Sequence, residues 1–169
     1  ADLVDHLSEA ALNRNRITVE IEWFIHLAQN QVIESVRRLT PEEVDDLRAF
    51  AAGFDDETIA TLAAHEAVTV HDVKAVEYTV KEALVEIGAD DLSELVHFCC
   101  TSEDINNLSW ALGIKGATEQ VWLPRAKALI DTLAESASAL AEVPMLAHTH
   151  GQPATPTTMG KELAVFVHR

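Results

Sequence analysis

The sequence THGQPA at residues 149–154 separates two strongly helical segments, and the rest of the chain is read outward from it. Before it, the alanine-rich run ESASALA at residues 135–141 is typical of a helix, and a proline follows soon after. After it, we expect a new helix over residues 157–169. The stretch therefore places the side chains of His150 and Gln152 in a turn between helices, where they can reach a ligand.

The first third of the chain also has a helical pattern. Its apolar residues recur with a helical period from Leu3 to Val36, which predicts one long helix with a bend near residues 13–15. The sequence TPEE at residues 40–43 is a capping box with proline at the first helical position, and Gly53 ends the short helix that it opens.

The remaining helices follow with short connections. They are predicted at residues 56–67, 71–87, 91–99 and 101–142. Pro124 predicts a kink or a break in the last of these. We find no alternating strand pattern of useful length, so the sequence predicts an all-α fold.

The character of the helices changes near residues 88–92, from short capped helices to long ones. We therefore expect a small N-terminal helical domain over residues 1–90 and the first part of a long-helix bundle over residues 91–169. An amphipathic helix without packing partners would leave an apolar face exposed, so we expect the chain to form part of something larger.

Composition limits the classes of function. The 169 residues include 28 acidic and 12 basic side chains, giving a formal net charge of −16, which argues against non-specific nucleic-acid binding. No signal-peptide pattern and no apolar run of membrane-spanning length are visible, so we expect no membrane partner.

Cys99 and Cys100 are adjacent and are interpreted as reduced thiols of a cytoplasmic protein. Neither metal-ligand spacing nor a cofactor fingerprint is found, so we expect no metal and no cofactor.

Two polar clusters stand at predicted helix starts. In HDVKAVEY at residues 71–78, His71 and Lys74 beside a helix N-terminus suit an anion, although a solvated helix face explains them as well. In TSEDINN at residues 101–107, a helix cap explains the first residues, yet two hydroxyls and free amides would also cradle a carboxylate. The two asparagines of this stretch could reach a ligand or a buried partner.

The third cluster is HTHGQ at residues 148–152. His150 can donate a proton to a leaving group, and the amide of Gln152 both donates and accepts hydrogen bonds. The alternative is a loop histidine whose hydrogen bonds go to the backbone. Metal binding by alternating histidines would require a strand, and none is predicted nearby.

Taken together, these segments resemble the adenylosuccinate lyase family of the fumarase/aspartase superfamily, in its bacterial branch. The resemblance rests on TSEDINN and THGQPA, supported by HDVKAVEY and by GKE at residues 160–162, which occur in the right order over nearly the whole chain. It implies a fumarase/aspartase-like fold and a carbon–nitrogen lyase. The reaction would be a cofactor-free β-elimination of fumarate from adenylosuccinate, giving AMP, and from the succinyl-carboxamide ribotide of purine biosynthesis.

The resemblance also implies roles by position. His150 corresponds to the general acid, and Thr101 and Ser102 correspond to residues that hold the substrate carboxylates. His71 and Asp72 correspond to a pair that lines the nucleotide pocket. The other residues expected around the substrate are His97, Thr149 and Gln152, with Lys74 only close to the pocket and His148 left out.

Two features of the family are not found in this sequence. Its catalytic base is a serine on a Gly/Ser-rich loop far downstream, and its phosphate-binding Arg and Tyr lie in an N-terminal segment. The 169 residues are therefore expected to be a piece of a cytoplasmic homotetramer and to be inactive alone. The alternatives are another superfamily lyase, such as argininosuccinate lyase or fumarase, and a non-catalytic helical interaction module.

Overall fold

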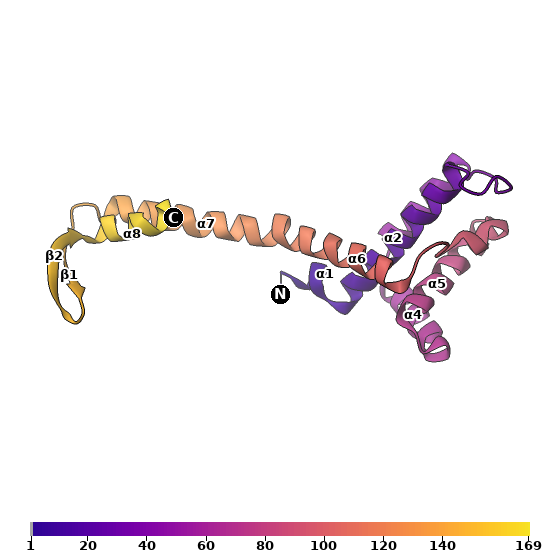
Figure 1. Ribbon diagram of the computed structural model, residues 1–169, viewed down its shortest axis with the longest axis horizontal. Coiled ribbons are helices and arrows are strands. Elements are labelled where there is room, and N and C mark those ends of the chain that lie inside the picture. The colour runs from indigo at the N-terminus through magenta and orange to yellow at the C-terminus, as the bar shows by residue number, and fades with distance from the viewer. Residues whose placement is uncertain (1) are drawn as a thin grey trace. The chain divides into compact units, whose positions relative to one another are not determined.

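The computed structural model describes residues 2–169, and the chain divides into two compact units, Ala1–Ala117 and Thr118–Arg169 (Figure 1). The first unit is helical throughout. Its elements are α1 (Val4–Leu7), α2 (Glu9–Gln29), α3 (Pro41–Ala52), α4 (Asp56–Thr69), α5 (Asp72–Glu86), a 3₁₀-helix (Asp90–Leu95) and α6 (Ser102–Gly116). The expected all-α fold is confirmed: the described residues are mainly helical, and their one sheet is a two-stranded hairpin.

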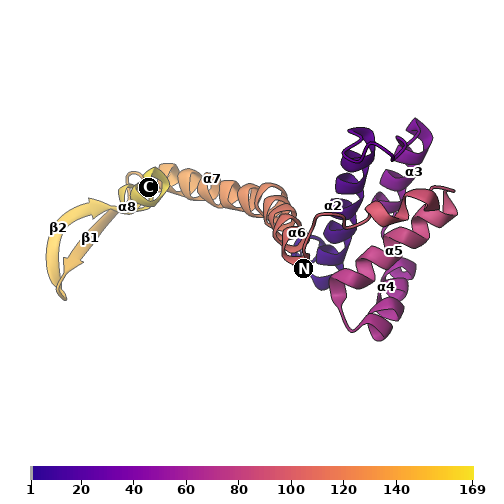
Figure 2. The same ribbon diagram turned by 45° about the vertical axis from the view of Figure 1, so that its right-hand side comes forward.

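The core of the first unit lies where α2 meets α3 and α5, and Figure 2 shows α4 beside α5. Ile17, Ile21 and Phe24 of α2 are fully buried there. Val76 and Val80 of α5 are buried against the same cluster. These side chains recur at helical spacing, so one stripe of each helix supplies the core.

The N-terminal helix differs from its prediction. Ser8 interrupts it, because the Ser8 hydroxyl caps α2 by accepting a hydrogen bond from the Ala11 amide at 3.1 Å. The helix is continuous through residues 13–15, near which a bend was predicted: the side chain of Asn13 accepts from Arg16, and that of Asn15 donates to the Ser109 carbonyl. The helix also ends at Gln29, short of the predicted end at Val36.

The predicted caps are confirmed. Thr40 and Glu43 form the capping box of α3, and Gly53 is its C-cap. The helix expected at residues 91–99 is a 3₁₀-helix only to Leu95, and an irregular turn follows it.

The second unit begins within a long helical stretch. A π-helical segment, Ala117–Trp122, precedes α7 (Leu123–Ala139), so the predicted interruption occurs directly before Pro124. Proline lacks the amide hydrogen that an α-helix requires, and π-type turns absorb such defects. No residue of α7 is buried, and Leu129, Ile130 and other large apolar side chains are exposed in this unit.

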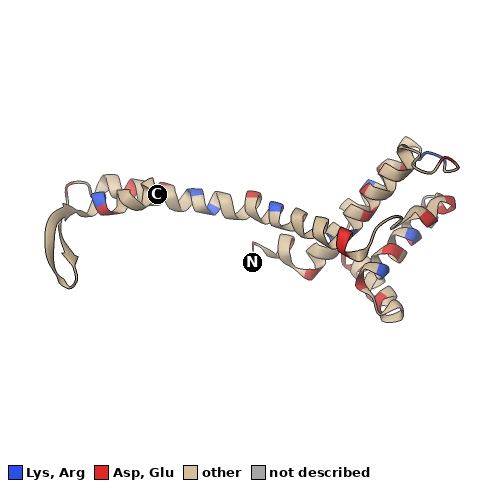
Figure 3. Cartoon of the chain, in the orientation of Figure 1, with Lys and Arg blue, Asp and Glu red and all other residues tan. Residues whose placement is uncertain are grey.

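The absence of strands was a wrong prediction. Pro144–Thr149 (β1) and Gln152–Thr158 (β2) form an antiparallel hairpin, and α8 (Met159–His168) follows, capped by Thr158. Prolines in the second strand conceal it in the sequence, but both strands of a two-stranded sheet are edges, where proline is tolerated. The hairpin carries no Lys, Arg, Asp or Glu, as Figure 3 shows.

The predicted domain boundary at residues 88–92 lies inside the first compact unit. Assignment of residues 1–90 and 91–169 to different domains therefore stays a prediction. The division after Ala117 rests only on contacts between residues of this chain.

Candidate functional site

His71 and Ser102 come from different sequence clusters, and the fold brings them together. His71 is the N-cap of α5, where its Nδ1 accepts a hydrogen bond from the Lys74 amide at 3.2 Å. Its Nε2 lies 3.4 Å from Oγ of Ser102 at the start of α6. Because Nδ1 is an acceptor, a neutral His71 carries its proton on Nε2 and donates it to the hydroxyl. Two helix starts therefore meet at one point.

Thr101 is the N-cap of α6, as the sequence predicted. Its hydroxyl accepts from the Glu103 amide at 3.4 Å, and its own amide donates to Asp104 at 2.8 Å. The amide of Ser102 comes at the N-terminal end of the helix, where the helix dipole favours a negative charge. This end of α6 can therefore accept a carboxylate, but the cap itself is satisfied by the chain.

Asp72 is held by a buried arginine that the sequence reading did not single out. Arg16 donates to Oδ2 at 2.6 Å, and the Val73 amide donates to Oδ1 at 2.8 Å. Burial alone would raise the pKa of Asp72, but the Val73 amide and the Arg16 guanidinium outweigh it, so the pKa is lowered. Arg16 also donates to Asn106 at 2.9 Å, so this asparagine serves a buried partner. Asn107 bonds locally to Glu103.

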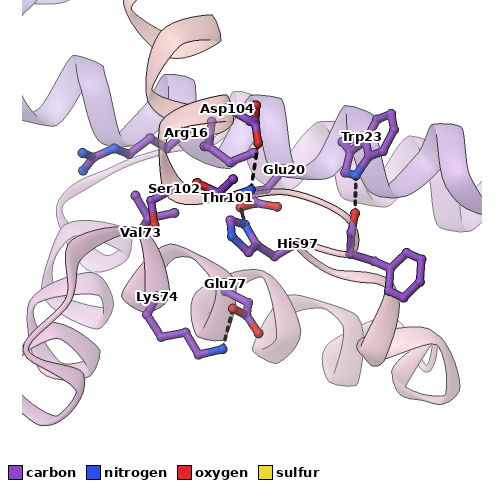
Figure 4. A network of polar contacts seen from close by, with 12 residues as sticks. Arg16, Glu20, Trp23, Val73, Lys74, Glu77, His97, Thr101, Ser102 and Asp104 are labelled. Carbon is purple, nitrogen blue, oxygen red and sulfur yellow. Dashed lines mark hydrogen bonds and ion pairs between the residues drawn. The ribbon is translucent and has the colours of Figure 1, made fainter.

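His97 is held by a second charged residue of α2 (Figure 4). Its Nδ1 lies 2.6 Å from Oε1 of Glu20, whose side chain is fully buried. Burial raises the pKa of Glu20, and the hydrogen bond to His97 only partly offsets this. The expected pocket histidine is therefore anchored from the core side.

These side chains border a pocket of about 360 Å³. Its lining residues are Thr69, His71, Val73, Lys74, Glu77, His97 and Ser102. The lysine is paired, because Nζ of Lys74 lies 2.7 Å from Oε2 of Glu77 (Figure 4). The pocket offers two imidazoles and a hydroxyl beside two helix starts, which suits a polar, anionic ligand.

A larger pocket of about 710 Å³ lies between α2 and α6 and is mainly apolar, with Trp23, Ile105 and Leu108 in its wall. It includes Cys99 and Cys100. Both cysteines are free, and burial raises the pKa of the Cys100 thiol to about 11. We place the candidate site at the smaller pocket, because it joins His71, His97 and Ser102, which the sequence singled out.

The remaining expected site residues lie in the second unit, on the hairpin. Thr149 and Gln152 are paired across its end, and His150 and Gly151 form the connection. The φ angles of His150 and Gly151 are 51° and 76°, and two positive φ angles characterise the type I′ turn that favours two-residue hairpins. The exposed His150 is thus presented at the tip. His71, Asp72, His97, Thr101 and Ser102 belong to the other unit.

Comparison with known proteins identifies the family. The Lyase family matches residues 2–169. The chain belongs to this lyase family. Adenylosuccinate lyase of Escherichia coli K12 is 44% identical over 163 residues, covering 96% of this lyase chain. That of Legionella pneumophila strain Corby is 44% identical over 168 residues, and that of Dictyostelium discoideum is 39% identical over 171 residues.

The chain spans little more than a third of these relatives, 36% of the E. coli protein. Its fold resembles that of β-carboxy-cis,cis-muconate cycloisomerase from Acinetobacter calcoaceticus, with a TM-score of 0.74 and 21% identity, over 99% of this chain and 37% of that one. Within residues 2–169, no cluster of three His, Cys, Asp or Glu side chains is arranged to hold a metal ion. No helix in that range has the length and apolarity of a membrane span.

The sequence alone did not point to Arg16 and Glu20. A signal was available, since both interrupt the buried apolar stripe of α2, next to Ile17 and Ile21. A charged side chain on a core-facing stripe requires a partner. The partners could not be identified from the sequence. Asp72 lies 56 residues from Arg16, and His97 lies 77 residues from Glu20.

Proposed function

We propose that this lyase acts on adenylosuccinate, eliminating fumarate to leave AMP, and on the succinyl-carboxamide ribotide in the same way. The observation that carries the proposal is the 44% identity to a curated adenylosuccinate lyase over nearly the whole chain. The meeting of His71 with Ser102 at a polar pocket supports it. The elimination removes a proton from carbon, forms the C=C bond of fumarate as the C–N bond breaks, and protonates the departing nitrogen, so acid and base side chains can carry it without a cofactor.

In the proposed mechanism, Ser102 and Thr101 bind the succinyl carboxylates at the N-terminal end of α6. Hydroxyl and amide donors there would stabilise the negative charge that grows on the carboxylate when its neighbouring carbon loses a proton. His71 and Asp72 line the nucleotide side, with Arg16 fixing the carboxylate of Asp72 at 2.6 Å. His97 completes this wall.

His150 is proposed as the general acid that protonates the departing nitrogen. Its place at a type I′ turn fixes the backbone while leaving the imidazole exposed. Thr149 and Gln152, paired across the hairpin end, would shape the wall around the leaving group. We assign the base that removes the carbon-bound proton to none of residues 2–169.

We further propose a cytoplasmic homotetramer whose sites combine residues of several subunits. Exposed apolar side chains on α7 and α8, such as Leu129, Ile130 and Phe166, support assembly because an isolated helix rarely leaves so much apolar surface in water. The same surface would fit a non-catalytic interaction module, which the activity test separates from the lyase.

The test is a chimera in which this chain replaces the matching segment of the E. coli relative. The chimera is purified from a strain lacking its own adenylosuccinate lyase, and cleavage is followed by absorbance. Argininosuccinate cleavage and fumarate hydration are measured alongside. Selective cleavage of adenylosuccinate is expected. A folded chimera that prefers argininosuccinate or fumarate would overturn the substrate assignment, and one inactive on all three would favour the interaction module.

A further inference from the structure

Glu20 is a buried carboxylate that no step of the proposed mechanism uses. Its side chain is 0% exposed in the middle of α2, and Oε1 lies 2.6 Å from Nδ1 of His97. Its other oxygen, Oε2, is buried and has no hydrogen-bond partner among residues 2–169. A half-satisfied buried carboxylate costs free energy, so core packing alone does not explain its presence.

His97 stands in a turn that is itself unusual. The φ angles of His97 and Cys99 are 61° and 62°, in the left-handed region that side chains other than glycine rarely adopt. Two side chains of α2 hold this turn: Glu20 through the His97 ring, and Trp23, whose Nε1 donates to the Phe98 carbonyl at 2.8 Å (Figure 4). Strained backbone that its surroundings hold in place is typical of functional sites.

The hydrogen bond also determines which imidazole nitrogen meets the pocket. When Glu20 is ionised, its carboxylate can only accept, so His97 donates through Nδ1–H, and the neutral ring then has its lone pair on Nε2. His97 lines the same pocket as His71 and Ser102. Within the described residues Nε2 has no hydrogen bond, so this nitrogen is left for a ligand.

We infer that Glu20 is a positioning residue: its buried carboxylate holds the proton of His97 on Nδ1 and presents Nε2 to the pocket shared with His71 and Ser102. The relevance of this arrangement to turnover rests on the proposed lyase function. The arrangement itself does not, because the proton position can be measured without substrate.

The first experiment is ¹⁵N NMR of the imidazole tautomers in the 169-residue chain at mildly alkaline pH. His97 is expected as the Nδ1–H tautomer, assigned by its loss in His97→Ala. Glu20→Gln should keep this tautomer, since the amide oxygen can accept the same bond, whereas Glu20→Leu should lose it. Trp23→Phe is the matched control: it removes the other bond to the turn and should leave the tautomer unchanged.

The second experiment measures kinetics in the chimera. Glu20→Leu should lower kcat/KM by about 10- to 100-fold, the usual cost of removing a partner that orients a functional histidine, and Glu20→Gln should recover most of it. On a His97→Ala background, Glu20→Leu should cause little further loss, because the effect passes through His97.

The His97 tautomer and the kinetics of the chimera test the inference and the proposed function separately. A wild-type His97 carrying its proton on Nε2, or a tautomer that survives Glu20→Leu, would overturn the positioning role whatever the activity. If the chimera cleaves adenylosuccinate but Glu20→Leu costs as much with His97 as without it, the inference fails and the proposed function stands. If Glu20→Leu does not fold, the His97 tautomers of the wild type and of Glu20→Gln still test the positioning role.

Discussion

The pocket at His71 and His97 and the hairpin at His150 hold their histidines in opposite ways. In the first unit, long-range polar partners fix the rings: Ser102 and Glu20 come from segments 31 and 77 residues away. On the hairpin, a two-residue turn fixes the backbone of His150 and leaves its side chain exposed. One arrangement holds the imidazole through its own hydrogen bonds, to a buried carboxylate in the case of His97, and the other fixes only the main chain. Each of the two arrangements can be disrupted by its own substitutions.

The largest expected effect comes from removing the hairpin side chain. His150→Ala in the chimera should lower kcat by about 10²- to 10⁴-fold, because general acid catalysis acts mainly in the transition state. Substrate affinity should change little. The control is His148→Ala on the same hairpin, expected to stay within about threefold of the parent chimera. A change confined to KM would make His150 a binding residue.

The next largest effect is expected from removing the hydrogen bonds of Arg16 in the first unit. Arg16→Met keeps an unbranched apolar stem but removes the guanidinium and its hydrogen bonds to Asp72, Asn13 and Asn106. Each hydrogen bond to a charged group typically contributes about 1.5–3 kcal/mol, so losing all three should lower the free energy of unfolding in urea by at least about that amount.

The matched control for this variant is Arg48→Met. Arg48 pairs with Glu22 at 2.7 Å, but both side chains are exposed, so a loss of about 0–1 kcal/mol is expected. Equal losses for the two arginines would show that the buried network does not stabilise the unit.

A smaller effect is expected from a substitution in the hairpin turn. Gly151 has a φ of 76°, and a side chain in that conformation costs about 1–2 kcal/mol, so Gly151→Ala should destabilise the hairpin by roughly that amount. Cross-strand NMR contacts between Thr149 and Gln152 report it. The reverse change, His150→Gly at a φ of 51°, should leave those contacts intact. Weakened contacts in the glycine variant would contradict the role assigned to the turn.

The smallest effect is a pH dependence in the first unit. The pKa of Asp72 is lowered in the folded chain, so its contribution to stability is present above the unfolded value of about 4 and is lost as the pH falls through the folded pKa. The stability difference between the wild type and Asp72→Asn should therefore shrink below about pH 4. The exposed Asp46→Asn is the control. A gap that widens on acidification would reverse the sign and refute the assignment.

The sequence was sufficient where the deciding interactions are local. The capping boxes at Thr40 and Thr101 and the helix end at Gly53 follow from residues three or four apart, and each was predicted correctly. The Ser8 break was also local, but the continuous apolar period concealed it.

The sequence was insufficient where the deciding partner is distant. The roles of Arg16 and Glu20 depend on which helices pack against α2. A bend was predicted near Asn13 and Asn15, but within the continuous helix Asn13 accepts a local hydrogen bond from Arg16, and Asn15 donates to the distant carbonyl of Ser109. The hairpin was missed because none of its residues is fully buried and prolines stand in both strands, so its sequence lacks the regular alternation of apolar and polar residues that predicts a strand.

The adjacent thiols at the end of the turn have a practical consequence. With a pKa of about 11, Cys100 is almost entirely protonated at neutral pH and reacts slowly with electrophiles, whereas Cys99 is exposed. A maleimide dye should therefore label one sulfur of the pair in preference to the other. The label would stand two residues from His97 and, without any engineered cysteine, would give an optical reporter of the pocket wall.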